Sequence, residues 1–482
     1  MKKQTQSIKH AVTYFHKHYI RLRLYISFYL LGISMLWLGG EWLIFFAVIP
    51  LISYIPHMQK MKLRQVLKDF YFGGVILCGF ANIFLFQVAP ENWTIELNGW
   101  FGVFSRLLSW LLASFICALA YVPIGFFLYK IKSFNRQLIA LPFLFPLAEL
   151  LRSYIFAFGA YGPHGNVSPN FNWGSLAVPA SGTWLVYSSR LLGFFGLTFL
   201  VVLINIGLYL IIVKRKILIP LSILLAITTL TLLCWRSGEV SNTQSLQVAA
   251  IHFKDKKNFA EVDRYYWPSK DTDIIVLPEY SDFLQSKDYK KLLGRLSKDG
   301  VLITSQENGA SPNGTNQVIV INKQGNVVYR QDKTFLIPTG EYMPYILQSS
   351  FRIIGKNKIL DDFNNLQKLT KGKNPEQNYA AADNVKIGAI ACSGVGALSA
   401  YQRLSDDGAD ILTNSASLSF LLPDSVYHAY AKNMARFQAV SNNKPFIQAS
   451  RSGQSYIIDN QGNFIAISIG NEDQLLQTKI YK

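Results

Sequence analysis

Three residues in the second half of the chain have side chains that could together catalyse acyl transfer. Glu279 lies in IIVLPEY, Lys333 in YRQDKTFLIPTGEYMP and Cys392 in VKIGAIACSG, with spacings of 54 and 59 residues. A thiolate can attack an acyl carbon, a carboxylate can take up and return the thiol proton, and an ammonium can stabilise the developing oxyanion. These residue types predict a nucleophilic cysteine that is assisted by a base and a cation.

Cys392 differs from the other cysteines of the chain. Cys78, Cys117 and Cys234 lie inside long apolar stretches, where cysteine behaves as a small hydrophobic residue. Cys392 instead ends a strand-like segment, as Glu279 does. A buried structural thiol is the alternative for a cysteine considered alone. Because reactive groups gather at the carboxyl ends of strands in α/β sheets, we expect Cys392 and Glu279 to meet there.

From about residue 237 the sequence alternates strand-like runs with charged helical segments. The strand-like runs are LQVAAIHF, DIIVLPE, GVLITSQE, QVIVIN, VKIGAIA, DILTNSA, KPFIQAS and SYIID. Charged segments such as 283–298 and 424–441 are expected to be helices. The pattern predicts a mixed α/β domain over residues 237–482.

The first 236 residues have the composition of a membrane domain. Their apolar runs are centred near residues 20–38, 41–56, 70–89, 103–129, 137–157, 186–213 and 217–235. Most of these runs have the roughly 20 residues that a helix needs to cross a bilayer core of about 30 Å. No small-residue cleavage site follows the first run, which we therefore interpret as a retained span and not as a signal peptide. We expect about seven transmembrane helices in residues 1–236.

The distribution of charge predicts the orientation of these spans. Residues 1–236 contain 20 Lys and Arg but only 5 Asp and Glu, which gives a net charge of +15. Residues 237–482 contain 27 Lys and Arg and 24 Asp and Glu, which gives +3 of the total of +18. The basic residues form short clusters on every second loop, which disfavours a nucleic-acid partner and fits the positive-inside rule. The amino terminus is therefore expected in the cytoplasm and the α/β domain outside.

Glu149 and Arg152 lie three residues apart in LAELLRSYIF, at the outer end of a predicted span. An ion pair between them would satisfy two charges that are costly when alone in a membrane. The outer loop 158–182 is rich in Gly, Pro, Asn and aromatic residues, so we expect it at headgroup level. It could shape a lipid access site or form an ordinary aromatic belt.

The order Glu, Lys, Cys resembles the triad of the nitrilase, or carbon–nitrogen hydrolase, superfamily. The segment RFQAVSNNKPFIQASRSGQSYIIDNQG looks like the closing segment of that superfamily. With seven spans ahead of this domain, the chain from about 20 to 470 resembles the apolipoprotein N-acyltransferase family of bacteria. The likeness also covers ELLR at 149–152, GFFGLTFLVVLIN at 193–205 and PTGEYMP.

The resemblance implies a multi-span α-helical membrane domain followed by a nitrilase-like αββα sandwich in the periplasm, on the bacterial cell inner membrane. Glu279 would be the general base, Lys333 the oxyanion stabiliser and Cys392 the nucleophile. Glu341 matches a second essential glutamate of the family. The implied reaction moves a fatty acyl chain from a phospholipid to the amine of a diacylglyceryl-cysteine lipoprotein through a thioester, with no metal or organic cofactor.

The sequence departs from the family at two places. Ser393 and Gly394 follow the cysteine where the family has Tyr and Glu, although the backbone N–H of Ser393 can still donate to an oxyanion. If the glutamate is needed, Gly394→Glu is expected to raise activity. The family also closes with an eighth span, whereas this chain ends in the polar QLLQTKIYK, so its carboxy terminus is expected outside.

Two alternative functions follow from these observations. A membrane-tethered amidase would use the same triad with water as acceptor, and it would have a polar, water-accessible pocket. A catalytically inactive paralogue would instead bind lipoproteins as an assembly factor, an idea motivated by the altered Ser393 and Gly394.

Overall fold

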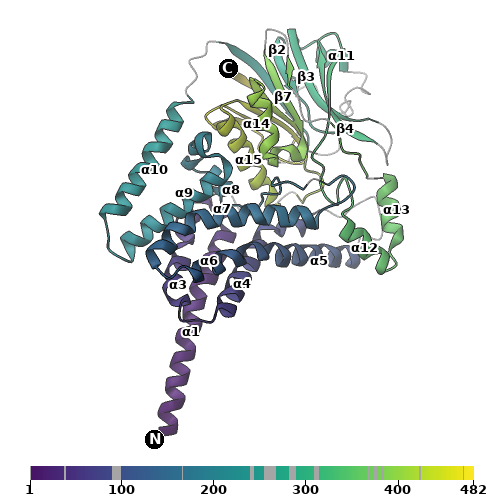
Figure 1. Cartoon of the computed structure of the whole chain (residues 1–482). Helices are drawn as coiled ribbons and strands as arrows, with labels where there is room; N and C mark the ends of the chain where they lie inside the picture. Colours follow the sequence, from purple (N-terminus) through teal and green to yellow (C-terminus); the bar gives the residue numbers. More distant parts are fainter. Residues whose placement is uncertain are drawn as a thin grey trace.

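The computed structural model of the 482-residue chain describes residues 2–36, 39–88, 99–165, 167–238, 244–254, 267–281, 289–308, 314–366, 368–373, 378–380, 385–422, 425–470 and 472–481. Helices form the first half of the chain, and two sheets with helices form the second half (Figure 1). The long first helix carries the amino terminus away from the rest of the molecule, at the opposite end from the carboxy terminus (Figure 1).

The helical half is a bundle of long apolar helices joined by short turns. Its α-helices are α1 (Lys2–Ile33), α2 (Ile44–Ala47), α3 (Ile49–Met58), α4 (Leu63–Ala81), α5 (Trp100–Cys117), α6 (Val122–Lys130), α7 (Phe134–Gly159), α8 (Ala177–Ser181), α9 (Ser189–Ile212) and α10 (Leu218–Arg236). Its 3₁₀ turns are η1 (Glu41–Leu43), η2 (Ile83–Leu85), η4 (Ala118–Tyr121) and η5 (Trp184–Ser188).

Five stretches of the described residues are long and apolar enough to cross a membrane. They are Glu41–Met58, Trp100–Lys130, Phe134–Gly159, Trp184–Ile212 and Leu218–Arg236. The other two predicted spans, 20–38 and 70–89, overlap with α1, which ends at Ile33, and with α4, which ends at Ala81; residues 37, 38 and 89 lie outside the described part. The total of seven crossings stays a prediction.

The outer helices expose large apolar side chains. Leu218 is 82% exposed, and Ile139 and Leu191 are each 68% exposed. In α10 only 22% of the most apolar window is buried inside the protein. An extended apolar surface of this kind is costly in water and favourable in lipid. The first half of the chain is therefore a multi-helix membrane domain.

The second half is built from twelve named strands and short helices. Its strands are β1 (Ser245–His252), β2 (Thr272–Val276), β3 (Leu296–Asn308), β4 (Thr315–Asn322), β5 (Val327–Asp332), β6 (Tyr379–Ala380), β7 (Lys386–Ala391), β8 (Ile411–Ser417), β9 (Phe446–Arg451), β10 (Tyr456–Ile458), β11 (Phe464–Ile467) and β12 (Gln474–Tyr481). Its helices are α11 (Tyr289–Leu293), α12 (Tyr345–Ile353), α13 (Asn357–Leu366), α14 (Leu398–Asp406) and α15 (Tyr427–Asn442).

All eight predicted strand-like runs are strands, and the helix predicted over 424–441 is confirmed as α15. The helix predicted over 283–298 is wrong beyond Leu293, because β3 begins at Leu296; residues 282–288 lie outside the described part. Lys298 and Asp299 are exposed in the structure. They lie where the register between β2 and β3 shifts, so a strand can carry them into solvent.

The strands form two six-stranded sheets that pack face to face. Their strand orders are β12-β1-β2-β3-β4-β5 and β11-β10-β9-β8-β7-β6. Val, Ile, Ala and Leu side chains from both sheets fill the space between them. On the outer faces, α11 packs on the first sheet, while α14 and α15 share a hydrophobic cluster with the second. This layering is the predicted αββα sandwich, and the chain ends in β12, which pairs antiparallel with β1.

Helix α15 joins the second sheet to the membrane domain (Figure 1). The ring of Phe437 packs edge-on against that of Phe194 at 5.2 Å. Arg436 Nη1 donates to Gly182 O at 2.7 Å, and Arg190 Nε donates to the carbonyl of Val440 at 3.0 Å. The second sheet, which carries Cys392, therefore faces the membrane domain.

Candidate active site

Glu279, Lys333 and Glu341 form a buried charged cluster. Lys333 Nζ lies 3.2 Å from Glu279 Oε1 and 2.6 Å from Glu341 Oε1. Buried charges are stable only when they are paired, and here one ammonium is shared by two carboxylates. Among the residues that the structure describes, no three His, Cys, Asp or Glu side chains are grouped to hold a metal ion. The Lys333 ammonium pairs with both carboxylates of this cluster.

Backbone contacts hold Glu279 and Lys333 just beyond the ends of their strands. Glu279 follows β2, and its N–H donates to Ala416 O in β8 at 3.2 Å, which connects the two sheets. Lys333 follows β5 directly, and its N–H donates to Asn316 O in β4 at 2.7 Å. The two residues therefore follow strands that β3 and β4 separate in the first sheet, and their side chains meet at 3.2 Å.

Cys392 begins the 3₁₀ turn η10 (Cys392–Gly396), directly after β7. Its φ of +45° lies in the left-handed region, which is costly for a residue with a side chain and often marks a functional site. Its Sγ lies 3.3 Å from Ser417 O, at the end of the parallel neighbour β8. The turn thus holds the thiol at the carboxyl end of the second sheet, as the sequence predicted.

Burial and neighbouring charges set the protonation of the site. Burial raises the pKa of the Cys392 thiol, and the Glu279 carboxylate raises it further, so the thiol is protonated at neutral pH. Burial also raises the pKa of Glu279, against the opposing charge of Lys333 and a hydrogen bond with the Cys392 thiol. Although burial acts to lower the pKa of Lys333, Glu279 and Glu341 outweigh it and raise that pKa. A protonated thiol beside a carboxylate of raised pKa is suited to proton transfer.

A tight loop orients the Glu341 carboxylate. Its Oε2 accepts a hydrogen bond from the Ile337 N–H at 2.8 Å, while its Oε1 binds Lys333. The loop closes through the Thr339 N–H, which donates to Tyr342 O at 2.8 Å with Thr339 at φ +66°. Glu341, singled out by the resemblance, therefore lies in direct contact with the predicted lysine.

Two asparagines contact Glu279 and Cys392, although the sequence analysis did not single them out. Asn316 Nδ2 donates to Glu279 Oε1, and Asn414 Nδ2 donates to Cys392 O at 3.2 Å. Both side chains are fully buried and lie inside strands. Asparagine is rare in buried strands, so its presence in β4 and β8 was the available signal.

Ser393 and Gly394, which follow Cys392, have defined surroundings. Ser393 Oγ donates to Phe335 O at 2.7 Å, which ties the turn to the loop that follows Lys333. A Cβ on Gly394 would lie 2.0 Å from Ile390 Cγ2, and Ile390 is itself buried. A glutamate side chain at this position would have to displace Ile390, so we now expect that Gly394→Glu alone does not raise activity.

Gly394→Ala is expected to destabilise the protein by about 1–3 kcal/mol, the usual cost of overpacking a core. Its added methyl group would meet Ile390 Cγ2 at 2.0 Å. The thermal unfolding midpoint of the purified chain measures the loss. Ile390→Ala removes the opposing methyl group, so Gly394→Ala should be nearly neutral in that background. An equal loss in both backgrounds would contradict the steric explanation.

A small cavity opens beside the Cys392 thiol. Its lining residues are Ile337, Cys392, Ser393, Val395, Ala416, Leu418, Phe420, Tyr427, Ala431 and Gln448. Most of this wall is apolar, and Val395, Leu418 and Tyr427 belong to the hydrophobic cluster that also forms the core of the membrane domain. The thiol therefore lies beside a small, mostly apolar space, and every residue that lines this space belongs to the α/β half.

The expected ion pair between Glu149 and Arg152 is not formed in the described structure. Glu149 instead accepts hydrogen bonds from Ser175 Oγ at 2.5 Å and from the Leu176 N–H at 2.7 Å. Arg152 Nη1 donates to Trp173 O. Both charged side chains therefore hold the outer loop that follows α7 and do not hold each other.

A sequence profile described as carbon-nitrogen hydrolase matches residues 245–481, from the start of β1 to the end of β12. The apolipoprotein N-acyltransferase of Geobacter metallireducens is 25% identical over 457 residues, which cover 86% of this chain and 81% of that protein. The protein of the same name from Allorhizobium ampelinum is 26% identical over 212 residues, or 39% of this chain and 36% of that protein. The first of these matches extends across both halves of the chain.

Two solved structures are similar to the α/β half. A carbon–nitrogen hydrolase from Helicobacter pylori G27 is 17% identical, with a TM-score of 0.35, and covers 49% of this chain and 89% of its own. A Saccharomyces cerevisiae member of branch 10 of the nitrilase superfamily is 14% identical, with a TM-score of 0.36, and covers 50% of this chain and 92% of its own.

Proposed function

We propose that the chain is a bacterial inner-membrane N-acyltransferase, in which residues 245–481, matched by the carbon-nitrogen hydrolase profile, follow a multi-helix membrane domain. The proposed donor is a phospholipid, and the proposed acceptor is the α-amino group of a diacylglyceryl-cysteine lipoprotein. The names of two curated relatives support this activity, and one of them matches 86% of the chain. In this proposal residues 1–236 lie in the membrane and residues 237–482 in the periplasm.

The observation that carries the proposal is the small, mostly apolar cavity beside Cys392, in the α/β half. Val395, Leu418 and Phe420 line it, and each packs with the hydrophobic cluster of the membrane half. An acyl chain is stabilised by such a wall, whereas the small polar substrate of an amidase gains nothing from it. The cavity therefore favours a lipid substrate over the amidase alternative.

In the first half-reaction the Cys392 sulfur attacks the ester carbon of the phospholipid. Glu279 takes the thiol proton and returns it to the leaving alkoxide, so the products are an acyl thioester and a lysophospholipid. The Lys333 ammonium and the backbone N–H of Ser393 stabilise the tetrahedral oxyanion. Glu341 holds Lys333 at 2.6 Å and thereby keeps it charged and oriented.

In the second half-reaction the lipoprotein amine attacks the thioester carbon. Glu279 accepts the amine proton and passes it to the departing Cys392 sulfur, which restores the thiol and releases an amide. Lys333 serves the second oxyanion as it served the first. The two proposed steps use no metal or organic cofactor. Only one lipid substrate has to lie at the thiol at a time.

Incubation with acyl-labelled phospholipid in the absence of acceptor tests the proposal. We expect label on the protein, followed by its quantitative transfer to the amine of a diacylglyceryl lipopeptide added later. Release of the label as free fatty acid with no transfer would favour the amidase alternative. If the protein takes up no label, the inactive lipoprotein-binding paralogue is favoured. Binding of the lipopeptide to the unlabelled protein would then support that alternative.

The topology gives a further prediction. A reporter active only in the periplasm, fused after Lys482, should be active if the proposed topology is right, with the amino terminus in the cytoplasm and seven crossings before the carboxy terminus. A matched fusion after Lys216, in a basic loop, should be inactive. The opposite pattern would leave the catalytic domain without access to lipoproteins and would overturn the proposal.

A further inference from the structure

The membrane domain reaches into the catalytic site through the loop of residues 171–176. This loop is held on its membrane side by two buried charged groups. Glu149 accepts hydrogen bonds from Ser175 Oγ at 2.5 Å and from the Leu176 N–H at 2.7 Å, and Arg152 Nη1 donates to Trp173 O. Glu149 and Arg152 are each only 1% exposed, so these bonds lie beyond competition from water.

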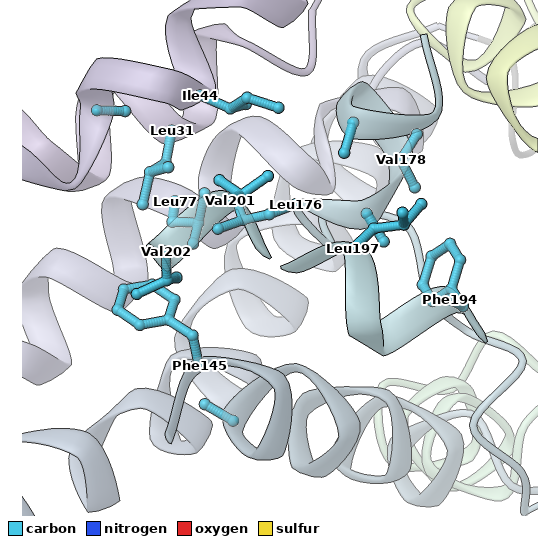
Figure 2. Packing of buried hydrophobic residues seen from close by; sticks show 14 of the residues in the cluster. Leu31, Ile44, Leu77, Phe145, Leu176, Val178, Phe194, Leu197, Val201 and Val202 are labelled. Atoms are coloured by element: carbon cyan, nitrogen blue, oxygen red, sulfur yellow. The ribbon is translucent and has the colours of Figure 1, made fainter. Parts of the chain in front are cut away.

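Leu176 anchors the carboxyl end of the same loop in the core of the membrane domain. Figure 2 shows Leu176 among the packed side chains of that core, with Val201 and Leu77 beside it. All three residues are at most 1% exposed. Both hydrogen bonds and apolar packing therefore hold the loop of residues 171–176 in place, so it is a rigid segment of the membrane domain.

The amino-terminal part of the loop contacts the turn that carries Cys392. Asn172 Nδ2 donates to Gly396 O at 3.0 Å, and Asn172 Oδ1 accepts a hydrogen bond from the Tyr430 OH at 2.6 Å. Asn172 is fully buried, and both ends of its amide are satisfied. The ring of the preceding Phe171 packs at 5.4 Å from the ring of Phe335, in the loop that follows Lys333.

Three side-chain amides hold carbonyl groups of the Cys392 turn. Asn414 donates to Cys392 O at 3.2 Å, Gln438 donates to Val395 O at 3.0 Å, and Asn172 donates to Gly396 O at 3.0 Å. A short 3₁₀ turn cannot satisfy its terminal carbonyls internally, so these donors decide how firmly it is held. Asn414 and Gln438 belong to the catalytic domain, whereas Asn172 belongs to the membrane domain.

We propose that Asn172 is a positioning residue for the nucleophile, through which the membrane domain fixes the turn that carries Cys392. The inference rests on the proposed role of Cys392 as nucleophile. The strained φ of +45° at Cys392 must be maintained by the surrounding contacts, and the bond from Asn172 to Gly396 closes the far end of the same turn. The alignment of the thiol therefore depends on the seating of loop 171–176 against Glu149 and Arg152.

Asn172→Leu in the full-length chain tests this inference, since leucine has a similar shape but neither donor nor acceptor. Backbone hydrogen exchange, followed by mass spectrometry of the peptide that contains residues 392–397, should become about tenfold faster, because Gly396 O loses its partner. The kcat of acyl transfer should fall by about ten- to a hundredfold with little change in KM, as expected for a misplaced nucleophile.

Two further variants separate positioning from a general loss of structure. Tyr430→Phe removes the hydrogen bond to Asn172 Oδ1 but keeps the bond from Asn172 to Gly396. Its effects on hydrogen exchange and on kcat should therefore be smaller than those of Asn172→Leu. Asn205→Leu is the matched control, because Asn205 is an equally buried asparagine of the membrane domain that donates to Ile44 O at 2.7 Å, away from the site. Asn205→Leu should leave exchange in residues 392–397 unchanged.

The outcomes distinguish this inference from the proposed function. Unchanged exchange in residues 392–397 of the Asn172→Leu variant would overturn the positioning role, whatever the activity of the wild type. Accelerated exchange of that turn in both the Asn172→Leu and Asn205→Leu variants would also overturn it, since the effect would then be a general loosening. A wild type that accepts no acyl group would instead refute the proposed function, while the exchange measurement would still test the support of the turn.

Discussion

Cys392→Ala should abolish the acyl label that the wild-type protein takes from phospholipid. The proposed intermediate is a thioester on the Cys392 sulfur, so no other group can carry it in a ping-pong reaction. In the wild type the label should form before any acceptor is added and should be released by hydroxylamine, which cleaves thioesters. Gel fluorography with a fluorescent acyl phospholipid, with and without hydroxylamine, measures both properties.

Cys234→Ala is the matched control for this substitution. Cys234 is also buried, at 7% exposure against 5% for Cys392, but it lies on α10 and not beside the charged cluster. Label formation should persist in Cys234→Ala at the wild-type level. A hydroxylamine-sensitive label that survives in Cys392→Ala would place the acyl group on another residue and refute the assignment.

Lys333→Met should lower activity by at least ~10²–10³-fold, the typical loss when one oxyanion donor is removed. A second effect adds to this loss. Lys333 holds the pKa of Glu279 down against the effect of burial, and without it that pKa rises further. A larger fraction of Glu279 would then be protonated, and a protonated carboxyl group cannot take the Cys392 proton. The rate of label formation measures the combined effect.

The same substitution should also destabilise the protein, because it leaves the Glu279 and Glu341 carboxylates buried without a cation. Breaking a buried ion pair in this way typically costs about 3–5 kcal/mol. Adding Glu341→Gln removes one of the two charges, so the double variant should recover part of the thermal unfolding midpoint but none of the activity. Full recovery of activity in the double variant would show that Lys333 acts only as a structural partner of Glu341.

The three proposed catalytic residues could be singled out from the sequence because two of them follow apolar strands, and residue chemistry indicated the third. Glu279 and Cys392 follow runs of buried Val, Ile and Ala, which a sequence displays directly. Strand β5, which carries the chain to Lys333, was not predicted. Its residues alternate between partly buried and exposed positions at the edge of the sheet, so it contains no apolar run.

Whether Gly394 could be replaced by the glutamate of the family could not be judged from the sequence. A glycine after the nucleophile is compatible with a missing glutamate, and so with the inactive-paralogue alternative. In the structure Ile390 occupies the space that any side chain at this position would need. The backbone of this turn is therefore adapted to glycine, a property that depends on packing within the folded domain.

The sequence by itself determined the two halves of the molecule, the apolar composition of the membrane half and the residue types that could perform acyl transfer. These properties are local, because hydrophobic periodicity and side-chain chemistry can be read from neighbouring residues. Only the tertiary structure decided that Glu341 shares Lys333 with Glu279, and that Asn172 reaches Gly396 across 224 residues of sequence. Such contacts arise when distant segments pack together, and no local pattern in the chain encodes which polar groups will then meet.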